Sequence, residues 1–481
     1  MTTSIVWFQQ DLRLDDHPAL AAAAAAGRVA PLFIWDPEGE APWAPGAARR
    51  WWMHHSLAAL ADSLERLGAP LRIVRGPAER VLPALAQEAG AAAVHAHERV
   101  EPPARERHRR VEGALRAAGV EFHLHQGDSL FAPHEIVSGA GTPYRVFTPF
   151  WRACSQAEPE APRPAPPRLE APHAWSGRER GRDALDALGL RPRIRWDVHM
   201  EREWTPGEAG AMARARDFLE ASLPGYATGR DRCDLPATSR LSPHLAHGDL
   251  SPRRLWAMLG AMRAPAADLA KLRSELGWRE FARHVLWHHP HTVDRPLRPE
   301  FDSFPWRDDA HGEERWREGR TGFPLVDAGM RQLWATGWMH NRVRMVVASF
   351  LVKDLLLDWR RGAAWFWETL VDADLASNTL GWQWCAGCGA DAAPFFRIFN
   401  PQSQGERFDP DGAYVRRWVP ELAGRPLREL HRAEPAEDDL PLLSSRATGV
   451  RPGGGYPAAL VDHAAARSRA LAALASVSRG R

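Results

Sequence analysis

The chain has 481 residues, of which 44% are hydrophobic and 25% are charged. These proportions are ordinary for globular domains, so they exclude wholesale disorder and a polytopic membrane protein. Lysine and arginine number 62 against 60 aspartate and glutamate, and a net charge of +2 does not by itself indicate a nucleic-acid partner. The length allows two to four domains.

The sequence shows no signal for a membrane, a disulfide framework or a metal. Its alanine-rich apolar run, residues 19–26, is far shorter than the roughly 20 residues of a membrane span. No basic segment with an apolar core opens the chain, so we expect a cytoplasmic protein. Four scattered cysteines predict reduced thiols, and the lone pair Cys385 and Cys388 favours packing over zinc. Without a coiled-coil pattern, we expect a monomer.

The first 130 residues alternate between strand and helix patterns. Short apolar runs lie at residues 5–8, 31–35, 71–74, 92–97 and 120–125. Helical periodicity separates them, most clearly over residues 47–67 and 104–118. This alternation predicts a parallel α/β domain at residues 1–130. The first strand is not followed by a GxGxxG turn, and there is no Walker A loop.

The remaining chain changes character twice. Residues 154–200 are rich in proline, arginine and glutamate, which indicates an interdomain linker, and we place it at residues 131–200. Beyond it, long helical windows follow at residues 269–288, 325–334 and 341–359. We therefore predict an N-terminal parallel α/β domain joined by a long linker to a C-terminal helical domain at residues 201–481.

Two groups of residues could carry chemistry. The spacing of Glu275, Trp278 and Arg279 places a carboxylate, an indole and a guanidinium on one helical face, where they could stack a flat ring and accept its N–H groups. A partly exposed helix with an ion pair would explain the same spacing. Asn341, Arg344 and Met345 share a second face, and a buried Arg344 would need a partner such as Asp372 or Asp374.

The loop at residues 371–378 holds two carboxylates and the amide of Asn378. Calcium is an alternative ligand for such a loop, but the central glycine and terminal glutamate of an EF-hand are missing. The chain also has 22 tryptophans against 4 tyrosines. Most of these indoles must build cores, because their bulk has to be packed and their N–H satisfied.

Three long segments, residues 6–14, 238–243 and 323–401, resemble the photolyase/cryptochrome family, most closely its class I cyclobutane pyrimidine dimer (CPD) photolyases. The resemblance covers nearly the whole chain. It implies an α/β antenna domain and a helical domain that holds FAD in a U-shaped conformation, active in its reduced anionic form. Both agree with the pattern of strands and helices.

The resemblance also assigns the FAD contacts. Those on the phosphate side match Tyr226, Thr238, Ser239, Leu241 and Ser242. Around the isoalloxazine and ribityl groups, the matching positions are Arg344, Asp372 and Asp374. Asn378 falls where the family places a residue facing flavin N5, and a neutral amide there would favour an anionic reduced flavin.

The family's lesion pocket has a matching set of apolar, aromatic and polar residues: Glu275, Trp278, Asn341, Arg342, Met345 and Trp384. As photolyases do in general, such a pocket would take a dinucleotide flipped out of DNA. Met345 and Trp384 argue against a six-four photolyase or a plant-type cryptochrome. Arg230, Arg342 and Arg397 match positions expected to hold the flanking phosphates, although each could be a solvated surface arginine.

Trp306, Trp359 and Trp382 match the tryptophan chain that photoreduces the flavin, although each could be a simple core residue. The implied enzyme is a deoxyribodipyrimidine photo-lyase, a carbon–carbon lyase acting on DNA that contains pyrimidine dimers. Excited reduced FAD would give an electron to the dimer, the cyclobutane ring would split, and the electron would return. Electron transfer would rest on the three tryptophans, assisted by Asn378 and Glu275.

Two other functions remain open. A blue-light cryptochrome would signal through flavin redox change, but it usually needs an extension, and only about 40 residues follow Leu440. A flavin-binding nucleotide module without photochemistry would require the three tryptophans to be disconnected.

The sequence departs from the family near the predicted antenna site. Gln9 and Gln10 stand where many relatives carry arginines, and residues 100–105 lack the Asn-Glu pair of folate-binding photolyases. The resemblance therefore favours a second, deazaflavin-type chromophore over folate. The residues that match its pocket are Trp35, Asp36, Arg50 and Glu101.

Overall fold

A computed structural model describes residues 2–175, 181–392, 394–434 and 455–478. Tertiary contacts divide the chain into two compact units. Unit 1 comprises Met1–Pro224, Ser239–Pro290 and Val371–Ser377, and unit 2 comprises Gly225–Thr238, His291–Leu370 and Asn378–Arg481. These boundaries differ from the predicted ones at residues 130 and 200, because much of the chain that follows the sheet packs in the same unit as the sheet.

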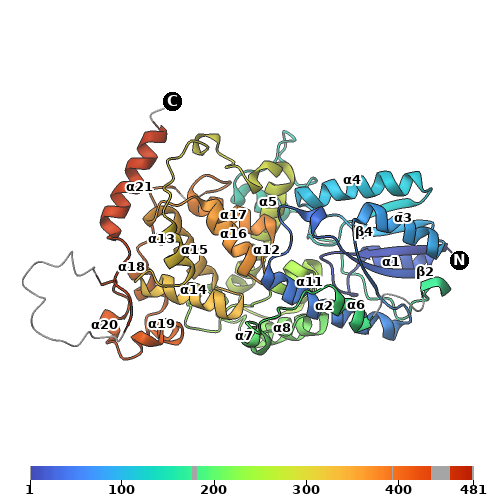
Figure 1. The fold of residues 1–481 in the computed structure, drawn as a ribbon, viewed down its shortest axis with the longest axis horizontal. Helices are drawn as coiled ribbons and strands as arrows, with labels where there is room; N and C mark the ends of the chain where they lie inside the picture. Colours follow the sequence, from blue (N-terminus) through green and yellow to red (C-terminus); the bar gives the residue numbers. More distant parts are fainter. Residues whose placement is uncertain (1, 176–180, 393, 435–454, 479–481) are drawn as a thin grey trace, which may run out of the picture. The chain divides into compact units, whose positions relative to one another are not determined.

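Unit 1 contains a five-stranded parallel sheet in the order β3-β2-β1-β4-β5. The strands are β1 (Thr2–Phe8), β2 (Gly27–Trp35), β3 (Arg72–Arg75), β4 (Ala93–His97) and β5 (Glu121–His125). Alternate side chains of β1 enter two separate cores: Val6 and Phe8 face one, Ile5 and Trp7 the other. Helices cover both faces (Figure 1), so the predicted parallel α/β fold is confirmed.

The α-helices of unit 1 are α1 (Pro18–Ala26), α2 (Ala47–Leu67), α3 (Ala78–Ala89), α4 (Pro102–Ala117), α5 (Phe147–Cys154), α6 (Gly181–Ala187), α7 (Val198–Glu203), α8 (Glu208–Ala221), α10 (Ser242–His247), α11 (Pro252–Ala261) and α12 (Ala266–His288). Short 3-10 turns lie at η1 (Glu38–Glu40) and η2 (His173–Trp175). α2 and α6 pack on one face of the sheet, and α3 and α4 on the other. α2 ends at Gly68, whose φ of 96° suits glycine, and the Gly68 amide donates to the Leu64 carbonyl.

The predicted linker is more ordered than its composition suggested. α5 and α6 lie within residues 131–200, and Leu169 and Trp175 are buried in the cores of the sheet. The Trp175 indole donates to the Pro31 carbonyl at 3.1 Å. The prediction that the proline-rich stretch lacks regular structure holds for residues 158–167 but fails beyond them, because apolar residues among the prolines find cores to fill.

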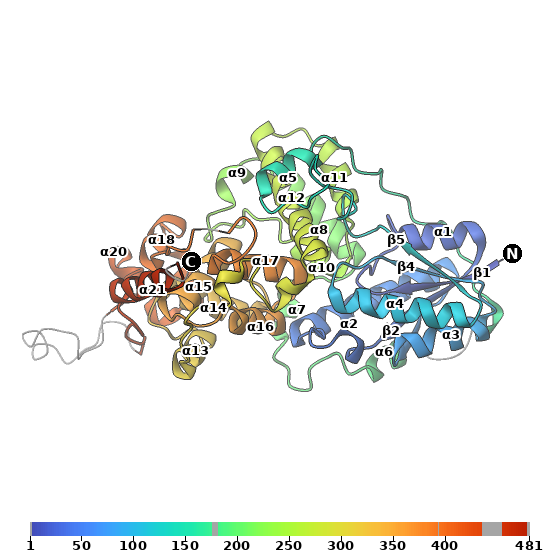
Figure 2. The same cartoon turned by 90° about the horizontal axis from the view of Figure 1, so that it is seen from above.

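Unit 2 is helical, as predicted. Its helices are α9 (Tyr226–Gly229), α13 (Ala310–Arg317), α14 (Pro324–Thr336), α15 (Asn341–Ser349), α16 (Trp359–Thr369), α18 (Pro401–Phe408), α19 (Ala413–Trp418), α20 (Leu427–Leu430) and α21 (His463–Ser478), with a π-helix at η5 (Phe350–Asp354) and 3-10 turns at η4 (Pro299–Phe301) and η6 (Pro420–Leu422). Two elements cross the boundary between the units, α17 (Leu375–Ala386) and η3 (Pro290–Val293). Figure 2 shows the same elements from a second direction.

The helix predicted over residues 341–359 is broken. α15 passes into the π-helix η5, and Leu356 then adopts a left-handed φ of 57°. The Asp358 side chain accepts from the Arg360 amide at 2.9 Å and begins α16 as a new helix. The apolar periodicity runs through this region, so the sequence pattern alone did not reveal the break.

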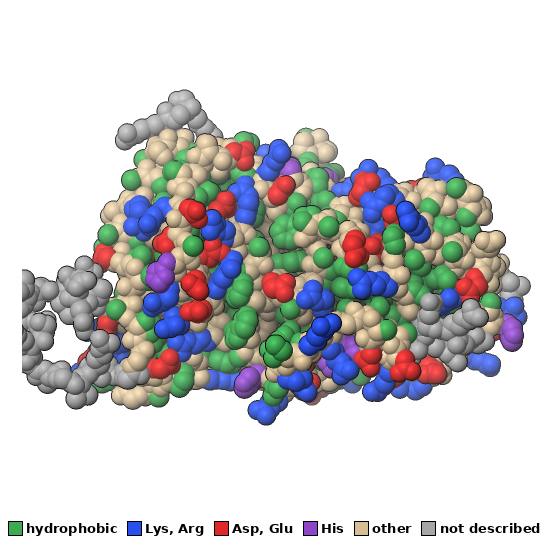
Figure 3. All heavy atoms as spheres, in the orientation of Figure 1, with side chains coloured by type: hydrophobic (Ala, Val, Ile, Leu, Met, Phe, Trp, Pro, Cys, Tyr) green, Lys and Arg blue, Asp and Glu red, His purple; other side chains and the backbone are tan. Residues whose placement is uncertain are grey.

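Two surface features agree with the composition. Among the described residues, no helix is long and apolar enough to cross a membrane. Basic and acidic side chains are interspersed on the face drawn in Figure 3, as a net charge of +2 would suggest.

Candidate active site

The predicted FAD and lesion contacts come from both units. Unit 1 carries Ser239, Leu241, Ser242, Glu275, Trp278, Asp372 and Asp374. Unit 2 carries Tyr226, Arg230, Thr238, Asn341, Arg342, Arg344, Met345, Asn378, Trp384, Arg397 and the tryptophans Trp306, Trp359 and Trp382. We describe each set within its own unit.

The segment predicted to hold the FAD phosphates has an anion-binding backbone. Arg240 adopts a left-handed φ of 53°, and Leu241 follows in a right-handed conformation with φ −88° and ψ −5°. Successive residues of opposite hand have the backbone conformation of a nest that can bind phosphate oxygens. In this structure the Leu241 amide donates to the Ser239 hydroxyl at 3.4 Å. The Arg240 side chain is held by Glu203 at 2.9 Å and by stacking 4.3 Å from the Trp204 ring. These contacts stabilise the strained backbone between Ser239 and Leu241.

A buried histidine supports the start of the predicted carboxylate loop. His247 Nε2 donates to the Val371 carbonyl at 3.0 Å, directly before Asp372. Its ring is stacked against Trp52, with centroids 5.7 Å apart. Burial lowers the pKa of His247 to about 3, so the ring is neutral and carries its proton on the donating nitrogen.

Asp374 caps the N-terminus of α17. One carboxylate oxygen accepts from the Ser377 amide at 2.7 Å, and the other lies 3.9 Å from the Arg283 guanidinium. Arg283 is buried on α12 and also donates to the Ser129 hydroxyl at 2.9 Å. Sequence reasoning missed Arg283 because the partner of a buried arginine lies far away in the chain.

Glu275 and Trp278 lie one helical turn apart on α12. The Glu275 carboxylate pairs with Lys271 at 3.1 Å, a partly buried contact within the same helix. The Trp278 indole lies face to face on the Phe147 ring, with centroids 3.8 Å apart and planes 7° apart. Phe281 meets the indole edge-on at 5.9 Å. One face of Trp278 is therefore covered from within unit 1.

Two of the predicted phosphate-contacting arginines meet at His340. The Arg342 amide donates to His340 Nδ1 at 3.1 Å, which caps α15. Burial, assisted by the Arg230 and Arg342 guanidinium groups, lowers the pKa of His340 to about 4. Arg342 also pairs with Asp231 at 2.9 Å. The Nη1 atom of Arg342 lies 3.8 Å from the sulfur of Met345, so these two predicted lesion contacts are in contact with each other.

The other predicted contacts of unit 2 have separate anchors. Arg344 Nε donates to the Met339 carbonyl at 2.8 Å, and Asn378 Nδ2 donates to the Ala363 carbonyl at 3.0 Å. Asn341 begins α15 and is exposed, while Trp384 on α17 is half-buried. Arg397 is exposed near Phe399, with 5.8 Å between its guanidinium and that ring.

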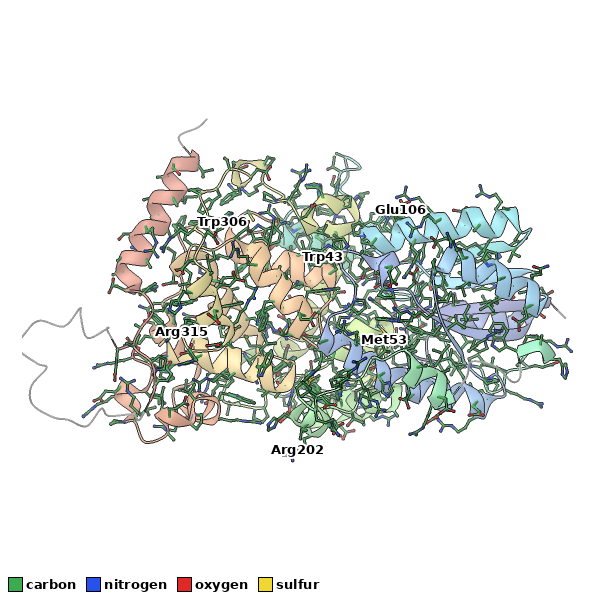
Figure 4. All side chains as sticks on the ribbon, in the orientation of Figure 1. Trp43, Met53, Glu106, Arg202, Trp306 and Arg315 are labelled. Atoms are coloured by element: carbon green, nitrogen blue, oxygen red, sulfur yellow. The ribbon has the colours of Figure 1, made fainter. Side chains whose placement is uncertain are left out.

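The three predicted electron-transfer tryptophans differ in burial. Trp359 and Trp382 are each 2% exposed, whereas Trp306, labelled in Figure 4, is half-buried beside Phe304. The Trp382 ring contacts Phe366 at 5.0 Å and Trp316 at 6.3 Å, both edge-on. Trp316 is fully buried and was not among the predicted residues, because nothing in its local sequence distinguishes it from a core tryptophan.

A cavity lies at the carboxyl ends of β1 and β2, where open α/β sheets commonly bind ligands. It is lined by Gln9, Gln10, Phe33, Ile34, Trp35, Asp36, Pro37, Glu40, Pro45, Met53 and Arg107. Two predicted antenna residues, Trp35 and Asp36, therefore line it, as does Met53 on α2 (Figure 4). Asp36 accepts from the amides of Gly39 and Ala78, so its carboxylate also holds the local chain.

The other two predicted antenna residues are not among the cavity's lining residues. Arg50 donates to the Pro45 carbonyl at 3.2 Å, and Pro45 lines the cavity. Glu101 pairs with the buried Arg99 at 3.0 Å. Burial opposes ionisation of Glu101, but Arg99 outweighs it and holds the pKa near 2.

Asp11, His17 and His97 form a buried cluster in unit 1 that a metal ion could fit by distance. His17 Nδ1 accepts from the Leu20 amide at 3.0 Å, so the neutral ring carries its proton on Nε2. That nitrogen lies 3.0 Å from Asp11, and burial lowers the pKa of His17 to about 4. With its proton on Nε2, the neutral His17 ring is not set to ligate a metal, and the cluster is described by the close approach of both histidines to Asp11, at 3.0 Å and 3.2 Å.

Comparison with known proteins decides the family. A family model described as DNA photolyase matches residues 4–168, and one described as the FAD-binding domain of DNA photolyase matches residues 272–476. A deoxyribodipyrimidine photo-lyase of Agrobacterium fabrum is 47% identical over 98% of both chains. The chain belongs to the photolyase/cryptochrome family. The predictions of a flavoprotein and of an enzyme of the photo-lyase type are thereby confirmed at the level of the family.

Relatives with two kinds of name share this fold. A crystal structure of a class III photolyase from Agrobacterium tumefaciens is 45% identical, covers 100% of this chain and 98% of its own, and superposes with a TM-score of 0.92. A cryptochrome from Synechocystis is 31% identical, covers 98% and 99%, and gives a TM-score of 0.88. Cryptochrome-1 of Arabidopsis thaliana is 37% identical over 98% of this chain and 70% of its own. The class I subgroup therefore stays a prediction.

Proposed function

We propose that this protein is a light-driven DNA repair enzyme that splits cyclobutane pyrimidine dimers. The proposal is carried by the similarity of the chain, over 98% of its length, to a photo-lyase. The geometry of α12 agrees with it, because one face of Trp278 is covered by Phe147 and Glu275 lies one turn away. An indole held this way offers its other face to a flat, apolar ligand, while a nearby carboxylate can accept N–H groups.

Each part of the chain would have a distinct role. Trp278 and Trp384 would stack on the flipped-out dimer, and Glu275 and Asn341 would hydrogen-bond to the edges of its bases. Arg230, Arg342 and Arg397 would hold the flanking phosphates. These contacts orient the dimer and exclude water.

Bound reduced FAD would supply the electron that opens the cyclobutane ring and would take it back afterwards. The backbone nest at Arg240 and Leu241 would receive its phosphates. Asp374, held by Arg283 and by the Ser377 amide, and Asn378, held by the Ala363 carbonyl, would contact the flavin ring from anchored positions. Asn378 has no titratable proton, so it would not neutralise an anionic flavin.

Repair of a defined oligonucleotide tests the proposal. The purified, photoreduced protein should restore a thymine-dimer oligonucleotide under blue light, but not in the dark, and should leave a six-four lesion unrepaired. Glu275→Gln and Trp384→Ala should impair repair, whereas Glu112→Gln, on the exposed face of α4, should not. Full repair by both site variants would contradict the assigned pocket.

A blue-light photoreceptor is the second candidate, because the cryptochromes of Arabidopsis thaliana are 37% and 38% identical to this chain. Such a protein would photoreduce its flavin through Trp382, Trp359 and Trp306 without repairing DNA. Flavin photoreduction combined with no loss of either lesion would favour this alternative over repair.

We further propose that a deazaflavin-type antenna chromophore binds to unit 1 near Trp35 and Asp36, two predicted residues that line a small cavity there. Extraction of the purified protein with chromophore spectroscopy tests this, and a folate spectrum would contradict it. We also expect a cytoplasmic monomer, and light scattering should give a mass near 53.6 kDa.

A further inference from the structure

Three aromatic rings form a nearly parallel stack in unit 1. Phe147 on α5 is nearly parallel to two tryptophans, Trp278 on α12 and Trp151 one turn further along α5. The Phe147 and Trp278 planes are 7° apart with centroids at 3.8 Å, and the Phe147 and Trp151 planes are 8° apart with centroids at 6.3 Å. α5 lies beside α12 in both Figure 1 and Figure 2.

A glycine lets the two helices approach this closely. A Cβ atom at Gly277 would lie 2.5 Å from the ring of Trp151, far inside van der Waals contact. Below the stack, Phe150 is 2% exposed and packs on Phe281 at 5.3 Å. α5 therefore carries two rings that pack on α12, Phe147 on Trp278 and Phe150 on Phe281.

We propose that Phe147 is a positioning residue for the lesion pocket, setting the plane of the Trp278 indole and leaving a single face for the dimer. The role rests on the proposed function of Trp278. Without Phe147, a half-buried indole would sample several rotamers and would have to be ordered at each binding event. Because Phe147 restricts the Trp278 indole before DNA binds, less side-chain entropy is lost when the dimer binds.

The same contact should affect discrimination between damaged and undamaged DNA. The dimer needs the indole in one orientation, so losing Phe147 should weaken its binding. Undamaged DNA is held through its phosphates, which contact arginines rather than Trp278, so its affinity should change little. The ratio of the two affinities therefore separates positioning from a general loss of folding.

Dark binding measurements on the full-length, flavin-loaded protein test the proposal. Phe147→Leu keeps most of the apolar volume but removes the flat ring, and it should weaken dimer binding about 2- to 12-fold, the equivalent of an aromatic pair. Phe147→Tyr restores the ring and should remain within about 2-fold of wild type. Phe150→Leu is the matched control, since it removes a buried ring from the same helix and should lower thermal stability without changing lesion affinity.

¹⁹F NMR tests the contact between Phe147 and Trp278 in the absence of DNA. In protein labelled with 5-fluorotryptophan, the Trp278 resonance can be assigned by its loss in Trp278→Phe. Phe147→Leu should move that ¹⁹F resonance by removing the ring current of a ring 3.8 Å away, and Phe150→Leu should move it much less.

The outcomes distinguish the proposed repair function from the proposed role of Phe147. A wild-type protein that does not prefer dimer DNA would overturn the proposed function, and with it the role of Phe147. If wild type prefers the dimer and Phe147→Leu binds it equally well, the positioning role alone is refuted. An unmoved Trp278 resonance in Phe147→Leu would refute the stack itself.

Discussion

Gly362 on α16 lies directly against Trp382, one of the three predicted electron-transfer tryptophans. A Cβ atom at this position would lie 2.0 Å from Cη2 of the indole and within 2.6 Å of two further ring atoms. Ordinary carbon–carbon contact is about 3.5 Å, so Gly362→Ala requires a displacement of about 1.5 Å. The indole is 2% exposed and wedged against Phe366 and Trp316, so it has little room to move.

The expected loss follows from two opposing effects. Overpacking a core costs about 1–3 kcal/mol, and a shift this large belongs at the upper end of that range. Replacing glycine by alanine within a helix returns about 1 kcal/mol. We therefore expect Gly362→Ala to lower the free energy of unfolding by about 1–2 kcal/mol, measured by chemical denaturation with tryptophan fluorescence as the probe.

A matched glycine separates the two effects. Gly113 on α4 is exposed, and a Cβ atom there would meet nothing within 4 Å. Gly113→Ala should therefore stabilise the protein by about 0.5–1 kcal/mol through helix propensity alone. If Gly362→Ala were as stable as Gly113→Ala, the close packing of Trp382 on α16 would be refuted.

Two further predictions concern buried polar groups, Asp249 in unit 1 and the pair of His463 and Asp354 in unit 2. Asp249 is 1% exposed and accepts from Trp52 Nε1, His244 Nδ1 and the Gly207 amide, so Asp249→Ala should cost about 3–5 kcal/mol in chemical denaturation. In unit 2, the hydrogen bond to Asp354 raises the pKa of His463, and burial raises the pKa of Asp354. A group whose folded pKa is raised contributes stability at low pH and loses it as the pH rises through that pKa. The His463 shift therefore predicts that α21 becomes more sensitive to limited proteolysis as the pH rises above the ordinary pKa of histidine, and His463→Ala should flatten that profile.

Local signals predicted the elements well where the deciding contacts are local. The helix over residues 47–67 was predicted with its true ends, because Gly68 stops it in a conformation that glycine favours. The break after α15 was not predicted, because the residues on both sides of Leu356 are apolar and the periodicity continues through it. Its cause is the cap at Asp358 and the tertiary packing of the π-helix.

Composition predicted a linker at residues 131–200, but composition does not show which apolar residues of that segment pack into a core. The segment at residues 131–200 was assigned to a linker because of its prolines and charges. It also contains Phe147 and Trp175, one stacked on α12 and the other buried against the sheet. Both contacts join residues far apart in the chain, and no local pattern can reveal them. The aromatic run Phe147-Thr-Pro-Phe-Trp151 was the available signal.

For the candidate site, the sequence predicted which residues take part, but it could not predict which hydrogen bonds their polar atoms form. Asp36 was predicted as an antenna residue and does line the cavity, yet its oxygens accept from Gly39 and Ala78. Its carboxylate is thus already engaged in holding the chain. Arg107 and the neutral amide of Gln9, which also line the cavity, hydrogen-bond to each other at 2.8 Å, and Arg107 pairs with Glu40 at 3.0 Å. An arginine in place of Gln9 would put two positive charges side by side in a buried position, which burial makes costly. A neutral amide at Gln9 is therefore compatible with Arg107 beside it, which the sequence alone could not show because the two residues lie far apart in the chain.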